Sequence, residues 1–164
     1  MDRIREKIFE QYGNKLRIRV CGLCIEDEKI LLVNHHSLNI SGDFWAPPGG
    51  GMDFGQSAED NLKREFLEET GLVVEIEKFL FVHEYLNPPL HAIELLFKVK
   101  RTSGNLKIGY DPELGKNTQI IKNIRFIPFH EIIELGKNKL HQMFFNVHKI
   151  SDIAELKGYF LWIK

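Results

Sequence analysis

Residues 47–72 read PPGGGMDFGQSAEDNLKREFLEETGL, and the fold and the chemistry can both be approached from this stretch. Its carboxylates Glu65, Glu68 and Glu69 are spaced i, i+3 and i+4, so on a helix they lie within about a third of the circumference. Three carboxylates on one face repel each other, and a divalent cation among them would relieve the repulsion. Because hard cations such as Mg²⁺ take oxygen ligands, the spacing predicts a metal site on this face.

Local signals predict that the acidic stretch is a helix. Ser57 can cap its start, with Asp60 three residues later as a variant of the capping box. Gly71 can take the left-handed conformation that ends a helix. An apolar stripe lies directly beside the acidic face and consists of Ala58, Leu62 and Phe66. We therefore expect the carboxylates at the edge of the core. Ahead of the helix, the glycines at 49–51 are expected to form a loop whose backbone can approach a ligand closely, because no side chain stands in the way.

The same stretch resembles the signature of the Nudix hydrolases. Gly50 matches the first glycine of that signature, and residues 64–72 match its end, Arg-Glu-apolar-x-Glu-Glu-x-Gly-apolar. Trp45 and Pro48, ahead of the signature, are also typical of the family. One position departs from it, because Gln56 stands where the family has its first glutamate. In the family that side chain is credited with supporting the loop more than with binding metal.

The resemblance implies a metal-dependent hydrolase of pyrophosphate bonds. It implies that Glu65, Glu68 and Glu69 hold Mg²⁺ or Mn²⁺, with the backbone carbonyl of Gly50 as a further ligand. Arg64 would orient Glu65 through a charge-assisted hydrogen bond. The general base varies within the family, and here Glu69 and Glu65 are favoured over a carboxylate from a later loop.

The residues that would recognise a substrate are less clearly marked. A nucleotide base stacks on aromatic or guanidinium faces, and its phosphates attract cations. The side chains that could act in this way are Arg17, Arg19, His35, His36, Trp45 and Tyr85. Each also fits an ordinary structural role. Asp111 and Glu113, in the irregular stretch 102–121, could swing in as bases or could be solvated loop acids. Glu84 and Glu94, on predicted strands, could approach the metal or be paired within a sheet.

Strand and helix patterns alternate irregularly along the chain. Alternation and apolar runs predict strands at 16–25, 30–34, 73–86, 91–100 and 124–127. Helices are predicted at 1–13, over the acidic stretch, at 129–135 and around 140–147. This mixture predicts an α/β architecture with a mixed β-sheet between helices, similar to the α/β/α sandwich of the Nudix fold, and the resemblance runs over about 16–135.

We expect one domain over residues 1–164, with a short N-terminal helix at 1–13 and a C-terminal extension at about 136–164. The apolar end of that extension should dock on the domain. The N-terminal helix packs either on the domain or on a second copy of the chain, which would make a homodimer.

Composition narrows the class of protein. The chain has 164 residues, 43% hydrophobic and 27% charged, as is ordinary for a soluble globular domain. A net charge of −1 lacks the basic surplus that favours a nucleic-acid polymer as partner. No apolar run approaches the roughly 18 residues of a membrane span, and the start does not read as a signal peptide. We therefore expect a cytoplasmic protein with no membrane partner. Cys21 and Cys24 should be reduced core residues on opposite faces of one strand.

Three functional hypotheses remain at this point. The first is a metal-dependent pyrophosphohydrolase that cleaves a nucleoside diphosphate linked to another moiety, as in ADP-ribose or another sugar nucleotide, an NTP or a dinucleoside polyphosphate. The second is a non-catalytic Nudix domain that binds a small nucleotide as a sensor. Gln56 favours the sensor, and the intact set of three glutamates favours the enzyme. Isopentenyl diphosphate isomerisation on the same fold ranks lowest, because neither cysteine has a recognisable catalytic context.

Overall fold

The computed structural model describes residues 3–36, 42–109 and 119–163. In chain order its elements are α1 (Arg3–Tyr12), β1 (Lys15–Glu26), β2 (Lys29–His36), β3 (Asp43–Ala46), β4 (Gly49–Gly51), α2 (Ala58–Thr70), β5 (Leu72–Asn87), β6 (Leu90–Gly104), β7 (Ile121–Pro128), α3 (Phe129–Leu135), the 3₁₀ turns η2 (Lys137–Lys139) and η3 (Gln142–Phe144), α4 (Ile150–Ile153) and β8 (Gly158–Ile163). None of the described helices is both long and apolar enough to cross a membrane.

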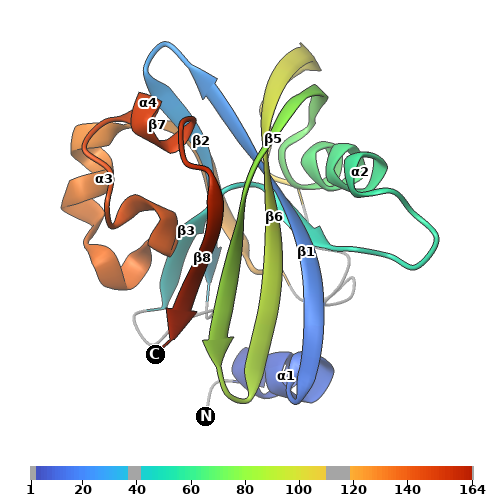
Figure 1. The fold of residues 1–164 in the computed structure, drawn as a ribbon. Helices are drawn as coiled ribbons and strands as arrows, with labels where there is room; N and C mark the ends of the chain where they lie inside the picture. The colour runs from blue at the N-terminus through green and yellow to red at the C-terminus, as the bar shows by residue number, and fades with distance from the viewer. Residues whose placement is uncertain (1–2, 37–41, 110–118, 164) are drawn as a thin grey trace.

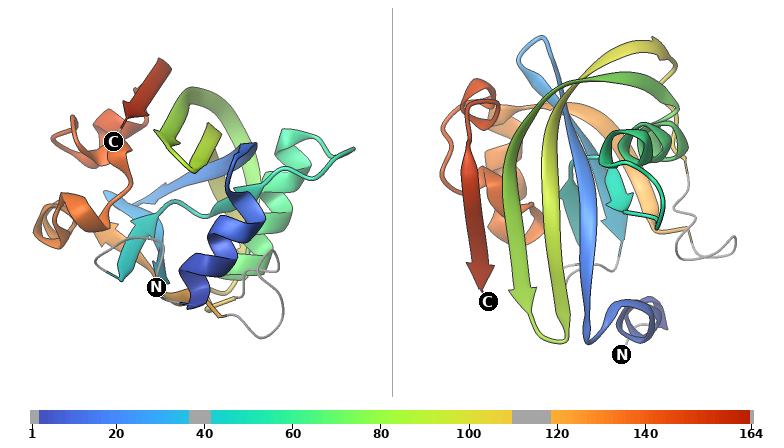
Figure 2. Two further views of the ribbon diagram at one scale, coloured as in Figure 1. Left: turned by 90° about the horizontal axis from the view of Figure 1, so that it is seen from below. Right: turned by 45° about the vertical axis from the view of Figure 1, so that its right-hand side comes forward.

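The strands form a mixed sheet in two halves that meet at β1. One half runs β4–β1–β6–β5–β8, the other runs β7–β2–β3, and the β1–β2 hairpin joins them. The β1–β6 and β5–β8 pairs are parallel, and the remaining pairs are antiparallel. Helix α2 lies on one side of the sheet, whereas α3 and the turns up to α4 lie on the other (Figures 1 and 2). The expected α/β class with a mixed sheet is confirmed.

Strand β1 has a hydrophobic core on each of its faces. Cys24 packs on the α2 side with Leu62 and Phe66, whereas Cys21 packs on the other side with Ile132 of α3. Both cysteines are buried and free, as the alternation along the strand predicts. Burial and the neighbouring Glu26 raise the pKa of Cys24 to about 11, so both position and chemistry make it an inert core residue.

Helix α2 begins and ends at the predicted residues. The Ser57 hydroxyl accepts a hydrogen bond from the Asp60 N–H at 3.1 Å and donates one to the Asp60 carboxylate at 2.7 Å. At the other end Gly71 has φ 72°, and its N–H donates to the Leu67 carbonyl at 3.0 Å. The two ends of the helix are thus set by its own sequence, and all three glutamates of the acidic face lie between them.

The C-terminal region differs in part from the prediction. No α-helix forms at 140–147; Leu140 is extended and bridges to Trp45, between two short 3₁₀ turns. Leu140, Phe144 and Val147 are all buried, so the spacing identified core residues but not their conformation. The apolar end does dock, because β8 pairs with β5 in parallel register.

We expect replacement of Ser57 by Ala to lower the free energy of unfolding by about 1 kcal/mol, because the first turn of α2 loses its side-chain cap. Chemical denaturation measures this change. Ser151→Ala, at an exposed position of α4, is the matched control and should change stability by a few tenths of a kcal/mol at most. Equal effects at the two serines would contradict a capping role for Ser57.

Candidate active site

The acidic face of α2 is the centre of the site. Glu65 and Glu69 are each only 2% exposed, whereas Glu68 lies at the edge of the face. The Arg64 guanidinium nitrogen Nη1 lies 2.9 Å from a carboxylate oxygen of Glu65 and 2.9 Å from one of Glu68. Burial opposes the charge on Arg64, but Glu65, Glu68 and Asp53 outweigh it and raise its pKa. Arg64 therefore lies where it can orient Glu65.

Two polar residues tie the loop after β4 to the helix. Arg64 Nη2 donates to Asp53 at 3.0 Å and to the Asn61 side-chain oxygen at 3.1 Å. Asn61 is fully buried, donates to the Gly51 carbonyl at 2.9 Å and accepts from the Asp53 N–H at 3.0 Å. Sequence reasoning missed Asn61. The available signal was a polar residue of low helix propensity on the buried stripe beside the acids.

The glycines of β4 lie against the two buried carboxylates. The Gly49 N–H donates to Glu69 Oε2 at 2.9 Å, and His35 Nε2 lies 3.5 Å from Glu69 Oε1. A Cβ atom on Gly50 would lie 2.5 Å from the Glu65 carboxylate, which is closer than atoms can approach. Gly50 is therefore required because the Glu65 carboxylate occupies the space of its side chain.

Residues 49–51 are paired with β1 and do not form an open loop. The N–H of Gly22 donates to the Pro48 carbonyl and the N–H of Met52 to the Ile18 carbonyl, both at 2.9 Å. Since bonded and non-bonded pairs alternate in an antiparallel ladder, Gly50 is in the bonded position opposite Val20 and its carbonyl faces β1. The carbonyl of Gly49 lies off the ladder, so it is better placed than that of Gly50 to meet a ligand.

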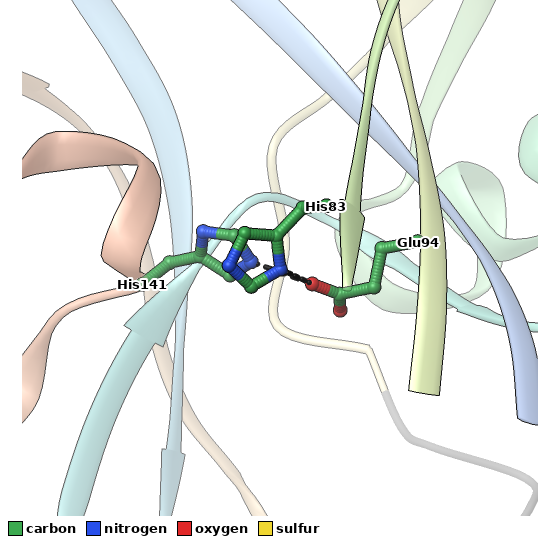
Figure 3. Close-up of side chains that lie close together, drawn as sticks. All are labelled: His83, Glu94 and His141. Carbon is green, nitrogen blue, oxygen red and sulfur yellow. Dashed lines mark hydrogen bonds and ion pairs between the residues drawn. The ribbon is translucent and has the colours of Figure 1, made fainter. Parts of the chain in front are cut away.

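A second buried cluster consists of His83, Glu94 and His141 (Figure 3). His83 Nδ1 and His141 Nε2 approach the same oxygen of Glu94 at 2.9 and 2.7 Å. All three residues are buried, and they come from β5, β6 and the segment between η2 and η3. Burial opposes ionisation of Glu94, but His141, His83 and Arg19 together hold its pKa well below the usual value.

Arg19 connects this cluster to the acidic face. Its Nη1 lies 3.6 Å from Glu94 Oε1, and its Nη2 donates to the Gly49 carbonyl at 3.3 Å. The same glycine donates its N–H to Glu69. A continuous series of polar contacts therefore runs from Glu94 through Arg19 and Gly49 to Glu69. Arg19, predicted as a substrate residue, is engaged in this network.

The ring nitrogens and the carboxylate of His83, Glu94 and His141 lie within 4.8 Å of one another, close enough to share one metal ion. The hydrogen bonds argue against that use. His141 Nδ1 accepts from the Met143 N–H at 3.2 Å, so a neutral His141 carries its proton on Nε2 and donates it to Glu94. Burial lowers the pKa of His141, which favours this neutral form. A metal on Nε2 would have to displace that proton, so we interpret the cluster as a hydrogen-bonded triad.

The other residues predicted to bind substrate lie in different parts of the structure. Arg17 stacks on the Tyr12 ring at 3.6 Å, and the Tyr85 hydroxyl accepts from Asn87 at 2.9 Å. Arg17 and Tyr85 face the same side of the sheet as Arg19, since both pair with Ala92 in the register.

Trp45 is buried in the core, with the Arg125 guanidinium 5.5 Å from its ring centre. His35 contacts Glu69, and His36 is within hydrogen-bond distance of the Gly42 carbonyl.

The remaining acidic candidates are away from the site or outside the described residues. Glu84 is bonded to His91 and Tyr159, on the opposite face of β5 from His83. It is therefore paired within the sheet. Asp111 and Glu113 lie outside the described residues.

Comparison with known proteins decides the family. The model of the NUDIX domain family matches residues 15–146, which is more than half of the chain. The chain belongs to the Nudix family. An ADP-ribose pyrophosphatase of Methanocaldococcus jannaschii is 34% identical over 112 residues, and the match covers 66% of this Nudix chain and 66% of the relative. The chain thus spans about two thirds of that relative's length.

Solved structures agree in fold with this Nudix chain. The crystal structure of a UDP-X diphosphatase matches with TM-score 0.66 and 20% identity, covering 95% of this chain and 73% of that one. An ADP-ribose pyrophosphatase from Streptococcus suis matches with TM-score 0.58 and 18% identity, covering 88% and 98%. At these identities the likeness supports the Nudix fold and nothing finer.

The donor set of the acidic face fits a hard divalent cation. Glu65 and Glu69 are buried, Glu68 is beside them, and Arg64 supplies one positive charge that is shared with Asp53. Burying carboxylates with so little compensation is costly unless a cation joins them. All of the side-chain ligands would be oxygen atoms, which Mg²⁺ and Mn²⁺ accept.

We expect Gly50→Ala to weaken Mn²⁺ binding at the acidic face by roughly tenfold, because the added methyl group displaces the Glu65 carboxylate. Titration calorimetry measures the affinity. In a background of Glu65→Asp, whose side chain is one methylene shorter, the same glycine replacement should weaken Mn²⁺ binding less. An equal loss in both backgrounds would contradict the contact between Gly50 and Glu65.

We expect Glu94→Gln to lower the free energy of unfolding at neutral pH by about 3 kcal/mol, because Arg19 and the two histidines lose a buried anionic partner. A carboxylate whose folded pKa is lowered contributes stability above its unfolded pKa, and this stability is lost as the pH falls toward the folded pKa. The difference from wild type should therefore shrink below about pH 4. Denaturation as a function of pH measures it.

Glu131→Gln provides the matched control, because Glu131 forms a partly exposed ion pair with Arg125. This replacement should lower the free energy of unfolding by less than about 1 kcal/mol at any pH. A cost at Glu94 that is as small as at Glu131, or that grows in acid, would contradict the ionised state of Glu94.

Proposed function

We propose that this Nudix chain hydrolyses the phosphoric anhydride bond of a small nucleotide, with Glu65, Glu68 and Glu69 holding Mg²⁺ or Mn²⁺. One observation supports this most directly. Two carboxylates are buried side by side on one helix face, one held by the Gly49 N–H and the other placed in the space that Gly50 leaves open. Such a preorganised anionic site is costly for folding and is suited to bind a cation.

The residues of the site have separable roles in this proposal. A divalent cation bound there would neutralise phosphate charge and lower the pKa of a water molecule. Glu69, fixed in orientation by Gly49 and close to His35, is one candidate for the general base. Glu65 is the other candidate, oriented by Arg64. For the backbone ligand we favour the Gly49 carbonyl over that of Gly50, since the latter faces β1.

We place ADP-ribose first among the substrates, because a relative at 34% identity is an ADP-ribose pyrophosphatase. Other sugar nucleotides, NTPs and dinucleoside polyphosphates follow. Arg17, Arg19 and Tyr85 share one side of the sheet, where cations and an aromatic ring could meet phosphates and a base. Trp45 and His35 are better explained by packing and by the contact with Glu69.

The sensor hypothesis loses its main support. Gln56 is exposed, and its backbone N–H donates to the Asp53 carbonyl at 3.2 Å, as expected for a loop residue. Its neutral side chain is exposed in the loop before α2, so we assign Gln56 to the loop and not to the acidic face. The hydrolase remains the better proposal.

We expect Glu69→Gln to reduce metal-dependent turnover by at least about a hundredfold without unfolding the protein, because the amide removes the charge of a ligand or base while keeping its shape. Glu59→Gln is the control, since Glu59 is an exposed acid in the first turn of the same helix. The assay measures products released from ADP-ribose, a second sugar nucleotide, an NTP and a dinucleoside polyphosphate, with Mg²⁺ or Mn²⁺.

Each result of this assay has a defined meaning. Turnover of one class that requires metal, is lost in Glu69→Gln and is kept in Glu59→Gln would support the proposal and identify the substrate class. Full activity of Glu69→Gln would remove its assignment as ligand or base. If nothing is cleaved while a nucleotide still raises the melting temperature, the sensor hypothesis replaces the hydrolase.

A further inference from the structure

A large apolar face lies on the side of the sheet that α2 partly covers. Strands β1, β6, β5 and β8 pair side by side, so residues opposite one another in the register point to the same face. Three successive rows across these strands are Leu16–His91–Leu86–Ile163, Ile18–Ile93–Glu84–Leu161 and Val20–Leu95–Val82–Tyr159. We call these twelve residues the outer face.

The outer face is the one that α2 covers only at its upper end. Val20, at that end, is fully buried in the cluster that includes Leu62 and Phe66 of α2. Farther down, no described helix or strand stands in front of these four strands (Figure 1; Figure 2, right). The exposed fractions there are high: Leu16 57%, Ile18 48%, Tyr159 57%, Leu161 47% and Ile163 64%. Half-buried Ile93, Leu95, Val82 and Leu86 lie between them.

The size of this face suits a protein interface. Five large side chains that are about half exposed present on the order of 500 Å² of mostly apolar surface, at the upper end of the largest patch on a typical monomer. Each partner of a standard interface contributes about 800 Å², which these side chains and their rim would nearly supply. Leaving such a surface in water forfeits hydrophobic stabilisation of roughly 25 cal/mol per Å².

The polar groups of the outer face are already paired with one another. Glu84 accepts hydrogen bonds from His91, at 2.7 Å, and from the Tyr159 hydroxyl. The three rows contain no Lys, Arg or Asp. Two copies of the face could therefore pack together without bringing unpaired like charges close to each other. No charged group would be buried without a partner. A membrane surface, by contrast, would call for basic residues around the apolar side chains.

We propose that the outer face is where two copies of this chain pack, sheet against sheet, about a twofold axis. A sheet face with this regular pattern fits best against another sheet of matching twist, and a second copy supplies one. In a twofold interface the same patch serves both partners, which requires a face that is compatible with itself. The outer face meets that requirement, being apolar and having its few polar groups internally paired. This proposal does not depend on the chemistry of the acidic site.

The test compares the oligomeric state of four forms of the full chain by sedimentation velocity over a wide range of protein concentration. The forms are wild type, Ile18→Glu, Leu161→Glu and Ile133→Glu. Ile133 lies on α3, away from the outer face, and is 64% exposed, so its variant controls for adding a charge at an exposed apolar site. We expect wild type and Ile133→Glu to sediment as dimers, and both outer-face variants to sediment at half that mass.

Circular dichroism and thermal unfolding establish that each variant is folded. If Ile18→Glu does not fold, Ile163→Glu at the end of β8 takes its place, since that side chain is 64% exposed and lies at the edge of the sheet. Monomeric wild type at every concentration would overturn the proposal, and so would dimers that persist in both outer-face variants. Monomeric wild type that binds phospholipid vesicles would overturn it as well and assign the face to a membrane surface.

Discussion

The hydrogen bond from the Gly49 N–H to the buried Glu69 carboxylate holds the site together. It joins a short strand to a helix that begins only after an intervening loop, and it partly satisfies an anion that has been removed from water. The contact is possible because Gly49 places its amide off the β1 ladder, while Gly50 leaves room for the second carboxylate. Without that close approach, Glu69 would lose its backbone partner while buried beside a second carboxylate.

The network behind this contact explains how several buried charges are tolerated. Glu94 and Arg19 form an ion pair, and Arg19 also reaches the Gly49 carbonyl. The two histidines complete the set by donating to the same carboxylate oxygen of Glu94. A buried ion pair stabilises a fold only when its remaining hydrogen-bonding groups are also satisfied. Here the partners of Glu94 and Arg19 come from separate elements, so the geometry of the acidic site and the stability of the sheet are coupled.

The sheet has two faces with different uses. The inner face carries Arg19, Glu94 and His83, whereas nine of the twelve residues of the outer face are apolar. Alternation along each strand separates the two, because successive side chains point to opposite sides. The same strands thus carry a charged network on one face and a mostly apolar surface on the other.

The sequence by itself determined the features that depend only on residues close together in the chain. The caps at Ser57 and Gly71 bound α2, the spacing of the glutamates places them on one helix face, and alternation along β1 separates Cys21 from Cys24. These features follow from local backbone geometry and side-chain direction.

Only the tertiary structure decided the rest. The triad brings Glu94 to His141, 47 positions away, and the pairing of β4 with β1 turned a predicted loop into a strand. The helix predicted around 140–147 was wrong for the same reason, since Leu140 is held extended by its bridge to Trp45. Such contacts form between segments far apart in the chain, and no local pattern encodes which partner will satisfy a buried polar group.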